Sequence, residues 1–408
     1  MTVIVRDPIH GSIPLEGWAL PLVDSPVVQR LRRVHQLGTA HLVYPGARHS
    51  RFEHSLGAHH LAGRLAVALG LTPEETRTVR AAALLHDVGH GPFSHAFEEL
   101  VKETGRRHEE TSGDLISWGP LADLLRQGGL DPVAVAEAVA GKGPLAPLVS
   151  GSLDADRTDY LLRDAHYTGV PSLVDPDRLL EVVARDPKHG IVLLPSGLTA
   201  AEALLTTRFL MYPAVYLHRT VRSTESMLLA AIRALIAAGH ATLQDLERET
   251  DDQVMARLRS AGGEPAELAS RLDERRLYKR ALEFRPAAHP EWGRLAKDGP
   301  ARRRLAAQLA DAAGLPHHQA LLDVPQQPKF RELALQVAQA DGTHQPLPEA
   351  SRLVGVMQEA RDDHWRAWLF CPKGERERLG RIAQRELGDL AVGAVAPPSG
   401  TAPPPKSL

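Results

Sequence analysis

The sequence is poor in cysteine, with Cys371 the single one in 408 residues. A chain with one cysteine forms no intrachain disulfide, which excludes the disulfide-stapled class of secreted proteins. No apolar run approaches the roughly 20 residues that cross a membrane. The N-terminal segment MTVIVRDPIHG also lacks the basic and apolar regions of a signal peptide. We therefore expect a cytoplasmic protein with no membrane partner.

Neither sign of charge is in excess, and aromatic residues are scarce. Lysine and arginine number 48 against 50 acidic residues, and aromatic residues make up 4% of the chain. Nucleic-acid platforms rely on a cationic groove and stacked rings, so nucleic acid is not a favoured partner, although a local basic pocket is compatible with these numbers. With 43% hydrophobic residues the chain can build a substantial core.

Helical periodicity dominates the first 240 residues. Residues 2–16 predict two short strands around a turn, and residues 36–50 predict a loop or hairpin. The segment Thr72-Pro73-Glu74-Glu75 has the form of a capping box, so a helix is expected to begin there and to end at Gly89. Further helices are expected from Ser94 and in the ranges 51–69, 108–140, 151–166, 174–185 and 198–238.

The composition changes after residue 240. Charged, alanine-rich helices are expected over 242–313, followed by strands near 320–324, 353–357 and 365–370. The prediction is a mainly α protein with a helical domain at 1–240, a smaller C-terminal α+β region at 241–396 and a disordered tail at 397–408.

The chain has 20 histidines, and several of them lie beside carboxylates in short motifs. His54 lies in RFEHS, His86 and Asp87 are adjacent in LLHDVGH, and Asp156 lies in LDADR. Imidazole and carboxylate ligands suit divalent metals, and no thiolate lies nearby. A single His-Asp pair is more often a satisfied polar pair than a set of metal ligands. Asp156 also shares one helical face with Tyr160 and Asp164, a pattern that fits a solvated face as well as a functional one.

The ordered motifs DPIHG, QRLRRVHQLG, YPGARHSRFEHSLG, LLHDVGHGPFSHAFE and LDADRTDYLLRDAHYTG resemble those of the HD-domain phosphohydrolases. The resemblance is to the deoxynucleoside triphosphate triphosphohydrolase branch of that family and covers roughly residues 1–235. It implies an HD-domain helical bundle that forms a homo-oligomer, either a dimer or a tetramer. It also implies a divalent ion (Mn, Mg, Fe, Co, Ni or Zn) and hydrolysis of a dNTP at the α-phosphorus to deoxynucleoside and tripolyphosphate.

The resemblance also assigns roles to individual residues. The implied metal ligands are His54, His86, Asp87 and Asp156, and the implied catalytic residues are His90, His95 and His108, with Glu109 fixing the tautomer of His108. The sequence does not decide which histidine gives the proton to the leaving 5′-oxygen. The implied phosphate contacts are Arg51, Arg157 and Arg208, and the other implied substrate contacts are Gln36, Leu37, Tyr160, Asp164 and Tyr216.

Some positions depart from the family pattern. Leu217 replaces a base-contacting glutamine, which leaves the base preference open. The positions of an activating guanine nucleotide are matched by Asp24, Gln29 and Arg32, yet Val3 replaces a lysine of that site. Gln29 and Arg32, three residues apart on a helix, are equally compatible with a structural role.

Two other functions stay open at this point. One is an HD phosphohydrolase that acts on nucleoside monophosphates, cyclic nucleotides or nucleic-acid ends, because the metal site dictates phosphoester chemistry more than it dictates the substrate. The other is a protein that binds nucleotide or nucleic acid without catalysis. The four potential metal ligands argue against the second.

Overall fold

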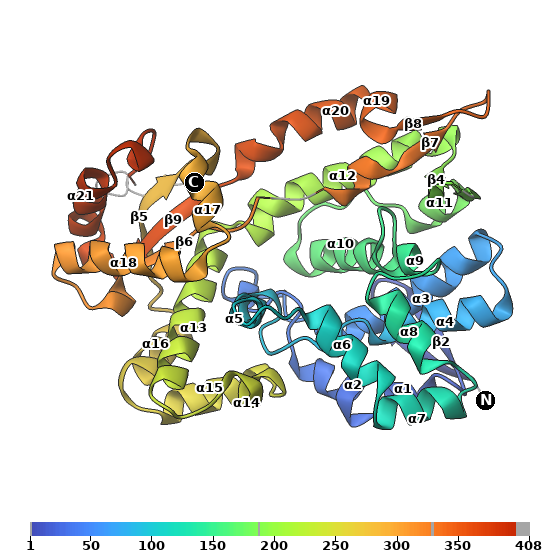
Figure 1. The fold of residues 1–408 in the computed structure, drawn as a ribbon, viewed down its shortest axis with the longest axis horizontal. Helices are drawn as coiled ribbons and strands as arrows, with labels where there is room; N and C mark the ends of the chain where they lie inside the picture. Colours follow the sequence, from blue (N-terminus) through green and yellow to red (C-terminus); the bar gives the residue numbers. More distant parts are fainter. Residues whose placement is uncertain (1, 187, 328–329, 397–408) are drawn as a thin grey trace, which may run out of the picture.

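The computed structural model describes residues 2–186, 188–327 and 330–396 (Figure 1). The chain is mainly α-helical, with a β-hairpin at its N-terminus and two further small sheets. This confirms the predicted fold class. The tail predicted for 397–408 lies outside the described residues.

The N-terminal segment is a β-hairpin, as predicted. Strands β1 (Thr2–Asp7) and β2 (Gly11–Glu16) pair antiparallel. Gly11 has a φ of 70° at the turn, a conformation that glycine adopts without a steric penalty. Ile13 and Leu15 of β2 are buried, so the hairpin packs onto the helical core through one face.

The centre of the bundle consists of α3 (Arg51–Ala68), α4 (Pro73–Leu85) and α10 (Ala155–Thr168). Helix α3 packs against both of the others. The predicted capping box is present, because Thr72 and Glu75 exchange hydrogen bonds with each other's backbone. Helix α4 ends at Leu85 rather than at Gly89, and a turn occupies 86–89.

Shorter helices surround this centre. The predicted helix over 108–140 is divided by Gly-Pro and Asp-Pro steps into three, and the predicted helix over 198–238 is divided by a π-helical turn at Tyr212–Tyr216. Proline removes a backbone donor, so each division falls at or near a proline. The helices around the centre are α1 (Leu20–Val23), α2 (Pro26–Arg30), α5 (His95–Lys102), α6 (His108–Ser117), α7 (Pro120–Gln127), α8 (Pro132–Val139), α9 (Ala146–Ser150), α11 (Pro176–Glu181), α12 (Leu198–Met211) and α13 (Arg219–Ala237).

A four-stranded sheet lies beside α12, in the order β3-β4-β7-β8. Its strands are β3 (Val183–Asp186), β4 (Gly190–Leu193), β7 (Gln336–Ala338) and β8 (His344–Pro346). The helix predicted over 174–185 is therefore wrong in its second half. The strand β4 pairs with β7 across about 140 residues of sequence, a partner that a local pattern cannot reveal.

The strand predicted at 353–357 is also wrong. Residues Arg352–Glu359 form α20, which begins after the N-cap Ser351 and follows α19 (Leu347–Ala350). Leu353 and Val356 are exposed while Val354 is buried, so the apolar run covers more than one side of a helix. A short apolar run does not by itself distinguish a helix from a strand.

The C-terminal part packs helices around a three-stranded sheet of order β5-β9-β6. The strands predicted near 320–324 and 365–370 are confirmed as β6 (Leu321–Asp323) and β9 (Ala367–Cys371). The alanine-rich stretch 242–313 is not all helical, because β5 (Lys279–Phe284) interrupts it to pair with β9. The helices here are α14 (Leu243–Glu247), α15 (Asp251–Ser260), α16 (Gly263–Asp273), α17 (Pro290–Leu295), α18 (Gly299–Ala313) and α21 (Arg376–Leu387).

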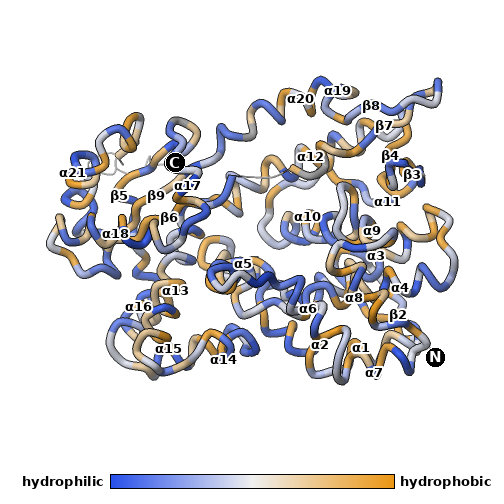
Figure 2. The backbone as a smooth tube through the Cα atoms, in the orientation of Figure 1, coloured by the Kyte–Doolittle hydropathy of each residue, from blue (hydrophilic) through white to orange (hydrophobic). Residues whose placement is uncertain are grey.

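The hydrophobic core of the bundle also takes side chains from the later chain, namely Leu335, Val337, Leu347 and Val354. The predicted boundary at residue 240 stays a prediction. Figure 2 shows hydrophobic and hydrophilic stretches alternating along the chain. Among the described helices, none is long and apolar enough to span a bilayer.

Candidate metal and substrate site

The four predicted metal ligands meet at one point inside the bundle. The Nε2 of His54 lies 3.1 Å from Oδ1 of Asp156 and 3.3 Å from Nε2 of His86. The Nε2 of His86 lies 3.5 Å from the same Asp156 oxygen and 3.2 Å from Oδ1 of Asp87. Two imidazole nitrogens and two carboxylates thus converge from α3, α10 and the end of α4.

The turn that follows α4 allows two adjacent residues to share this centre. Neighbouring side chains on a continuous helix point about 100° apart, whereas His86 and Asp87 lie where α4 gives way to a turn. Gly89 completes the turn, and a Cβ there would lie 2.4 Å from the backbone nitrogen of Ser112 on α6. Glycine at 89 is therefore required for α6 to pack against the turn.

The outer nitrogens of both histidines are already engaged. Nδ1 of His54 lies 2.8 Å from Oδ2 of Asp159, and Nδ1 of His86 lies 2.8 Å from the carbonyl oxygen of Ala83. An acceptor at Nδ1 fixes the tautomer that leaves the Nε2 lone pair facing the centre. The donor set and its orientation fit a divalent metal ion.

The charges around the centre favour a cation. Burial lowers the pKa of His54, but hydrogen bonds to Asp156 and Asp159 outweigh burial and raise that pKa to about 10. Burial raises the pKa of Asp87, yet Arg51 and His86 hold it well below its usual range. Carboxylates around His54 thus stabilise positive charge at this point, and cationic groups around Asp87 keep that carboxylate ionised.

Asp159, which is not among the site residues predicted from the sequence, links the centre to the N-terminal hairpin. Its carboxylate lies 2.6 Å from Nε2 of His10 and accepts from Nε of Arg163 at 2.9 Å. Arg163 also donates to Asp7 at 2.8 Å, so two residues of the DPIHG motif reach the metal ligand His54 through this network. A Cβ on Gly57 would lie 1.8 Å from the Asp159 carboxylate, so glycine makes room for it.

The three predicted catalytic histidines lie together beside the metal ligands. The rings of His90 and His108 stack with their centroids 3.8 Å apart, and the centroid of His95 lies 5.6 Å from that of His90. Nε2 of His90 lies 3.3 Å from Oδ1 of Asp87. His90 is buried, whereas the side chain of His95 is 69% exposed. His95 can therefore exchange protons with solvent.

Glu98 is the nearest carboxylate to two of these histidines. It lies 2.9 Å from Nδ1 of His108 and 3.3 Å from Nδ1 of His95. The predicted partner Glu109 lies farther from the same His108 nitrogen, at 3.3 Å. The hydrogen bond of His108 is thus to Glu98 rather than to Glu109.

The loop between the histidines has a strained backbone. Phe93 and Ser94 have φ values of 57° and 54°, which non-glycine residues rarely adopt. The backbone N–H of Phe93 donates to Oδ1 of Asp251 at 2.7 Å, and Oγ of Ser94 accepts from Nε of Arg51 at 2.6 Å. Asp251, at the start of α15, also accepts from the backbone N–H of His35 at 3.0 Å. These bonds hold the loop in place.

A cavity of about 450 Å³ opens onto the metal ligands. The predicted substrate contacts that line it are Gln36, Leu37, Arg51, Arg157, Tyr160, Asp164 and Tyr216. Arg208 does not line it, because its guanidinium packs against the rings of Tyr212 and Phe330. The structure therefore brings all but one of these predicted contacts to the cavity.

Some polar groups of this cavity are hydrogen-bonded within the protein, and one is not. The two oxygens of Asp164 accept from Oη of Tyr216 and pair with Nε2 of His49, each at 2.8 Å. Nη1 of Arg157 donates to the carbonyl oxygen of Gly151 at 2.6 Å. Oε1 of Gln36 is buried and has no hydrogen-bond partner among the described residues, so it is available to a ligand donor.

The residues that match the family's regulatory nucleotide site make contacts with neighbouring residues of the chain. The side chain of Gln29 donates to the carbonyl oxygen of Val23 and accepts from Nε of Arg32, each at 2.8 Å. The Arg32 guanidinium also lies 3.7 Å from the ring centroid of Phe52. Asp24 caps the end of α1. These contacts account for a structural role, and the regulatory role stays a prediction.

Comparison with known proteins gives two family matches. The model of the HD domain matches residues 51–139, and the model of the HD associated region matches residues 174–391. The first match contains His54, His86 and Asp87, together with the three catalytic histidines predicted above.

The chain is also similar to individual proteins, including two relatives by sequence and one solved structure. An uncharacterized protein of Methanocaldococcus jannaschii is 31% identical over 95% of this chain and 82% of its own length. A deoxynucleoside triphosphate triphosphohydrolase SAMHD1 homolog of Dictyostelium discoideum is 34% identical over 55% of this chain, and the alignment spans 48% of that relative. The crystal structure of a phosphohydrolase from Bacteroides thetaiotaomicron superposes with a TM-score of 0.72 and 27% identity over 91% of this chain and all of that one.

Proposed function

The chain belongs to the HD-domain family, and we propose that it is a metal-dependent dNTP triphosphohydrolase that releases deoxynucleoside and tripolyphosphate. The observation that carries the proposal is the convergence of His54, His86, Asp87 and Asp156 at the floor of a cavity lined by three histidines. The similarity to the triphosphohydrolase relative supports the choice of substrate.

The residues of the centre would hold the ion and the phosphate. A divalent ion bound there supplies Lewis-acid polarisation of the phosphate and a lower pKa for attacking water. Arg51 is fixed by Ser94 and Asp87 beside the ligands, so its guanidinium is in place to bind a phosphate oxygen. Its Nη2 is buried and has no hydrogen-bond partner among the described residues.

One of the three histidines would give a proton to the leaving 5′-oxygen. An imidazole suits this step because its pKa lies near neutrality. We propose His95 for the step, because it is the exposed member and can be reprotonated by solvent, with Glu98 orienting its Nδ1. His90 and His108 would orient the phosphate.

The sugar end of the cavity would select the deoxyribose. Asp164 is held by Tyr216 and His49, so each carboxylate oxygen keeps a further lone pair for a 3′-hydroxyl. Tyr160 lines the same end, where it would exclude a 2′-hydroxyl. Leu217 is not among the lining residues, so the base would be held by other groups.

Product analysis tests the proposal. The protein would be incubated with each dNTP and with Mn²⁺, Mg²⁺ or Co²⁺, and the products resolved by ion chromatography. Tripolyphosphate and deoxynucleoside in equal amounts support the proposal. Orthophosphate or mononucleotides would support the alternative HD phosphohydrolase, and binding without turnover would support the non-catalytic binder. Asp87→Asn should abolish turnover, and Asp123→Asn, an exposed aspartate of α7, is the control.

We also propose that the protein forms a homo-oligomer, a dimer or a tetramer, as the family resemblance implies. Light scattering coupled to size-exclusion chromatography, with and without a dNTP, tests this directly. A monomer under both conditions would contradict it.

A further inference from the structure

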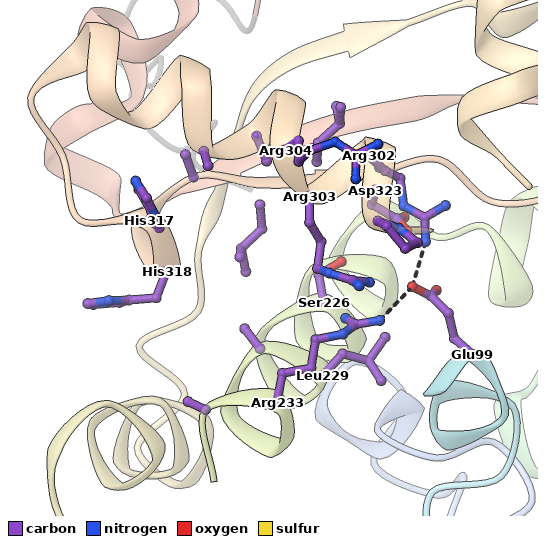
Figure 3. Close-up of a pocket in the computed structure, with 18 of the residues that line it drawn as sticks. Glu99, Ser226, Leu229, Arg233, Arg302, Arg303, Arg304, His317, His318 and Asp323 are labelled. Atoms are coloured by element: carbon purple, nitrogen blue, oxygen red, sulfur yellow. Dashed lines mark hydrogen bonds and ion pairs between the residues drawn. The ribbon is translucent and has the colours of Figure 1, made fainter. Parts of the chain in front are cut away.

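A second cavity, of about 630 Å³, lies among α13, α18 and β6. Its basic lining consists of Arg233 from α13 and of three consecutive arginines from α18, Arg302, Arg303 and Arg304. Figure 3 shows Arg303 and Arg233 approaching each other from the two helices. None of these arginines lines the metal-site cavity, so the two cavities are separate.

Three of the arginines share two carboxylates, Glu99 of α5 and Glu103 directly after it. Arg233 lies 2.8 Å from Glu103 and 3.3 Å from Glu99. Arg302 pairs with Glu99, and Arg303 pairs with Glu103, each at 2.5 Å. These ion pairs tie α5 to α13 and α18, which is a structural role, but they also fix the guanidinium groups in space. Preorganised arginines bind an oxyanion with less loss of side-chain freedom.

One guanidinium group of the cavity is left without an internal ion pair. Arg304 is exposed and makes no ion pair with any described residue. The carboxylate of Asp323 accepts from Nη2 and Nε of Arg222, at 2.7 and 2.9 Å. Glu264 lies 3.5 Å from Nδ1 of His318. Four arginines line the cavity together with three carboxylates, Glu99, Glu264 and Asp323, and Glu103 pairs with two of the arginines from beside it.

Much of the remaining lining is apolar, and the volume is that of a small-molecule site. Clefts that bind small molecules commonly measure about 300–1,000 Å³ and combine apolar walls with a few fixed polar groups. The apolar lining consists of Leu229, Ala230, Ala234, Ala306, Ala307 and Leu321. A ligand with an anionic end and an apolar body fits the arginines and the apolar residues of this lining.

We propose that this cavity binds a phosphorylated small molecule, with Arg303, Arg304 and Arg233 contacting its phosphate groups and Glu99 and Glu103 holding the arginines. Arginine presents paired N–H donors that match phosphate oxygens, which favours phosphate over a simple carboxylate. This inference does not rest on the proposed function, because it uses neither the metal centre nor the substrate cavity.

Isothermal titration of the full chain with inorganic tripolyphosphate, in EDTA, tests the site. Arg304→Ala removes a guanidinium that makes no internal ion pair, so it should not disturb folding. Arg303→Ala combined with Arg304→Ala removes the two central contacts. The control is Arg294→Ala, an exposed arginine of α17 that pairs with Glu291 outside the cavity.

We expect one class of tripolyphosphate site to weaken about threefold in the single variant and at least tenfold in the double variant, with dNTP turnover unchanged in both. The melting temperature should be unchanged in the single variant and slightly lower in the double variant, which loses the Arg303–Glu103 pair. Unchanged binding in the double variant would overturn the proposal, as would an equal loss in Arg294→Ala, which would indicate non-specific attraction. Repeating the titration with ATP identifies the source of the phosphate. If ATP binds at this site more tightly than tripolyphosphate, its nucleoside contacts the apolar residues of the lining.

Discussion

Asp159 should control the affinity of the metal centre although it does not face the ion. Its carboxylate lies 2.8 Å from Nδ1 of His54 and is itself held by Arg163 and His10. Loss of such an outer partner commonly lowers metal affinity about 10–100-fold, which corresponds to about 1.4–2.7 kcal/mol. Asp159→Asn keeps the shape of the side chain but removes its charge, so we expect a loss in that range.

The measurement is Mn²⁺ binding to EDTA-treated protein, by competition with a fluorescent chelator. Because Asp159 is part of a buried ion pair with Arg163, the variant should also lose about 3–5 kcal/mol of stability. Affinities must therefore be compared below its melting temperature. The matched control, Asp123→Asn, changes an exposed aspartate and should bind Mn²⁺ as the native protein does. A folded Asp159→Asn protein with the native Kd would refute the reasoning.

Three further predictions follow from other contacts. Asp251→Ala removes the acceptor that holds the strained turn at residues 93–94, so kcat should fall about tenfold or more while Mn²⁺ affinity stays native; an unchanged kcat would argue against the clamp. Tyr160→Ala should raise the ratio of ribonucleotide to deoxynucleotide hydrolysis, measured as relative kcat/KM, and an unchanged ratio would place the sugar gate elsewhere. Burial, and then the charge of Arg80, lower the pKa of His59 to about 3. Between this value and the unfolded pKa of about 6.5, only the unfolded chain takes up the proton. His59→Gln should therefore reduce the loss of stability on acidification in that pH range by up to about 1.4 kcal/mol per pH unit, measured in urea titrations.

Local signals predicted the elements that depend on local interactions. The capping box at Thr72 and Glu75 placed the start of α4, and the Asp7–Gly11 turn placed the hairpin. Both rely on contacts within about four residues, which the sequence displays directly. The end of α4 was misplaced by four residues, because the turn at 86–89 depends on the distant Ser112.

Long-range partners were the main source of error. The strand β5 lies in an alanine-rich stretch and forms because β9 pairs with it, about 85 residues later. The run at 353–357 forms a helix because Val354 packs into the core of the bundle. In both places tertiary packing decides between structures that the local pattern leaves open.

The same distinction applies to the site. The four metal ligands belong to short motifs and were predicted by resemblance, and the structure places them together. Glu98, Asp159 and Asp251 were not predicted, because each acts on a residue from another element. A partial signal existed for Asp159, which lies four residues before Arg163 on one helical face.

The central claim is that His54, His86, Asp87 and Asp156 bind one divalent ion. The most direct test is an anomalous difference map, collected at the manganese absorption edge from crystals grown with Mn²⁺. We expect one strong peak in contact with all four side chains, and we expect it to be lost in crystals of Asp156→Ala. A map with no peak among these residues, or with the ion bound elsewhere, would show that they do not form the metal site.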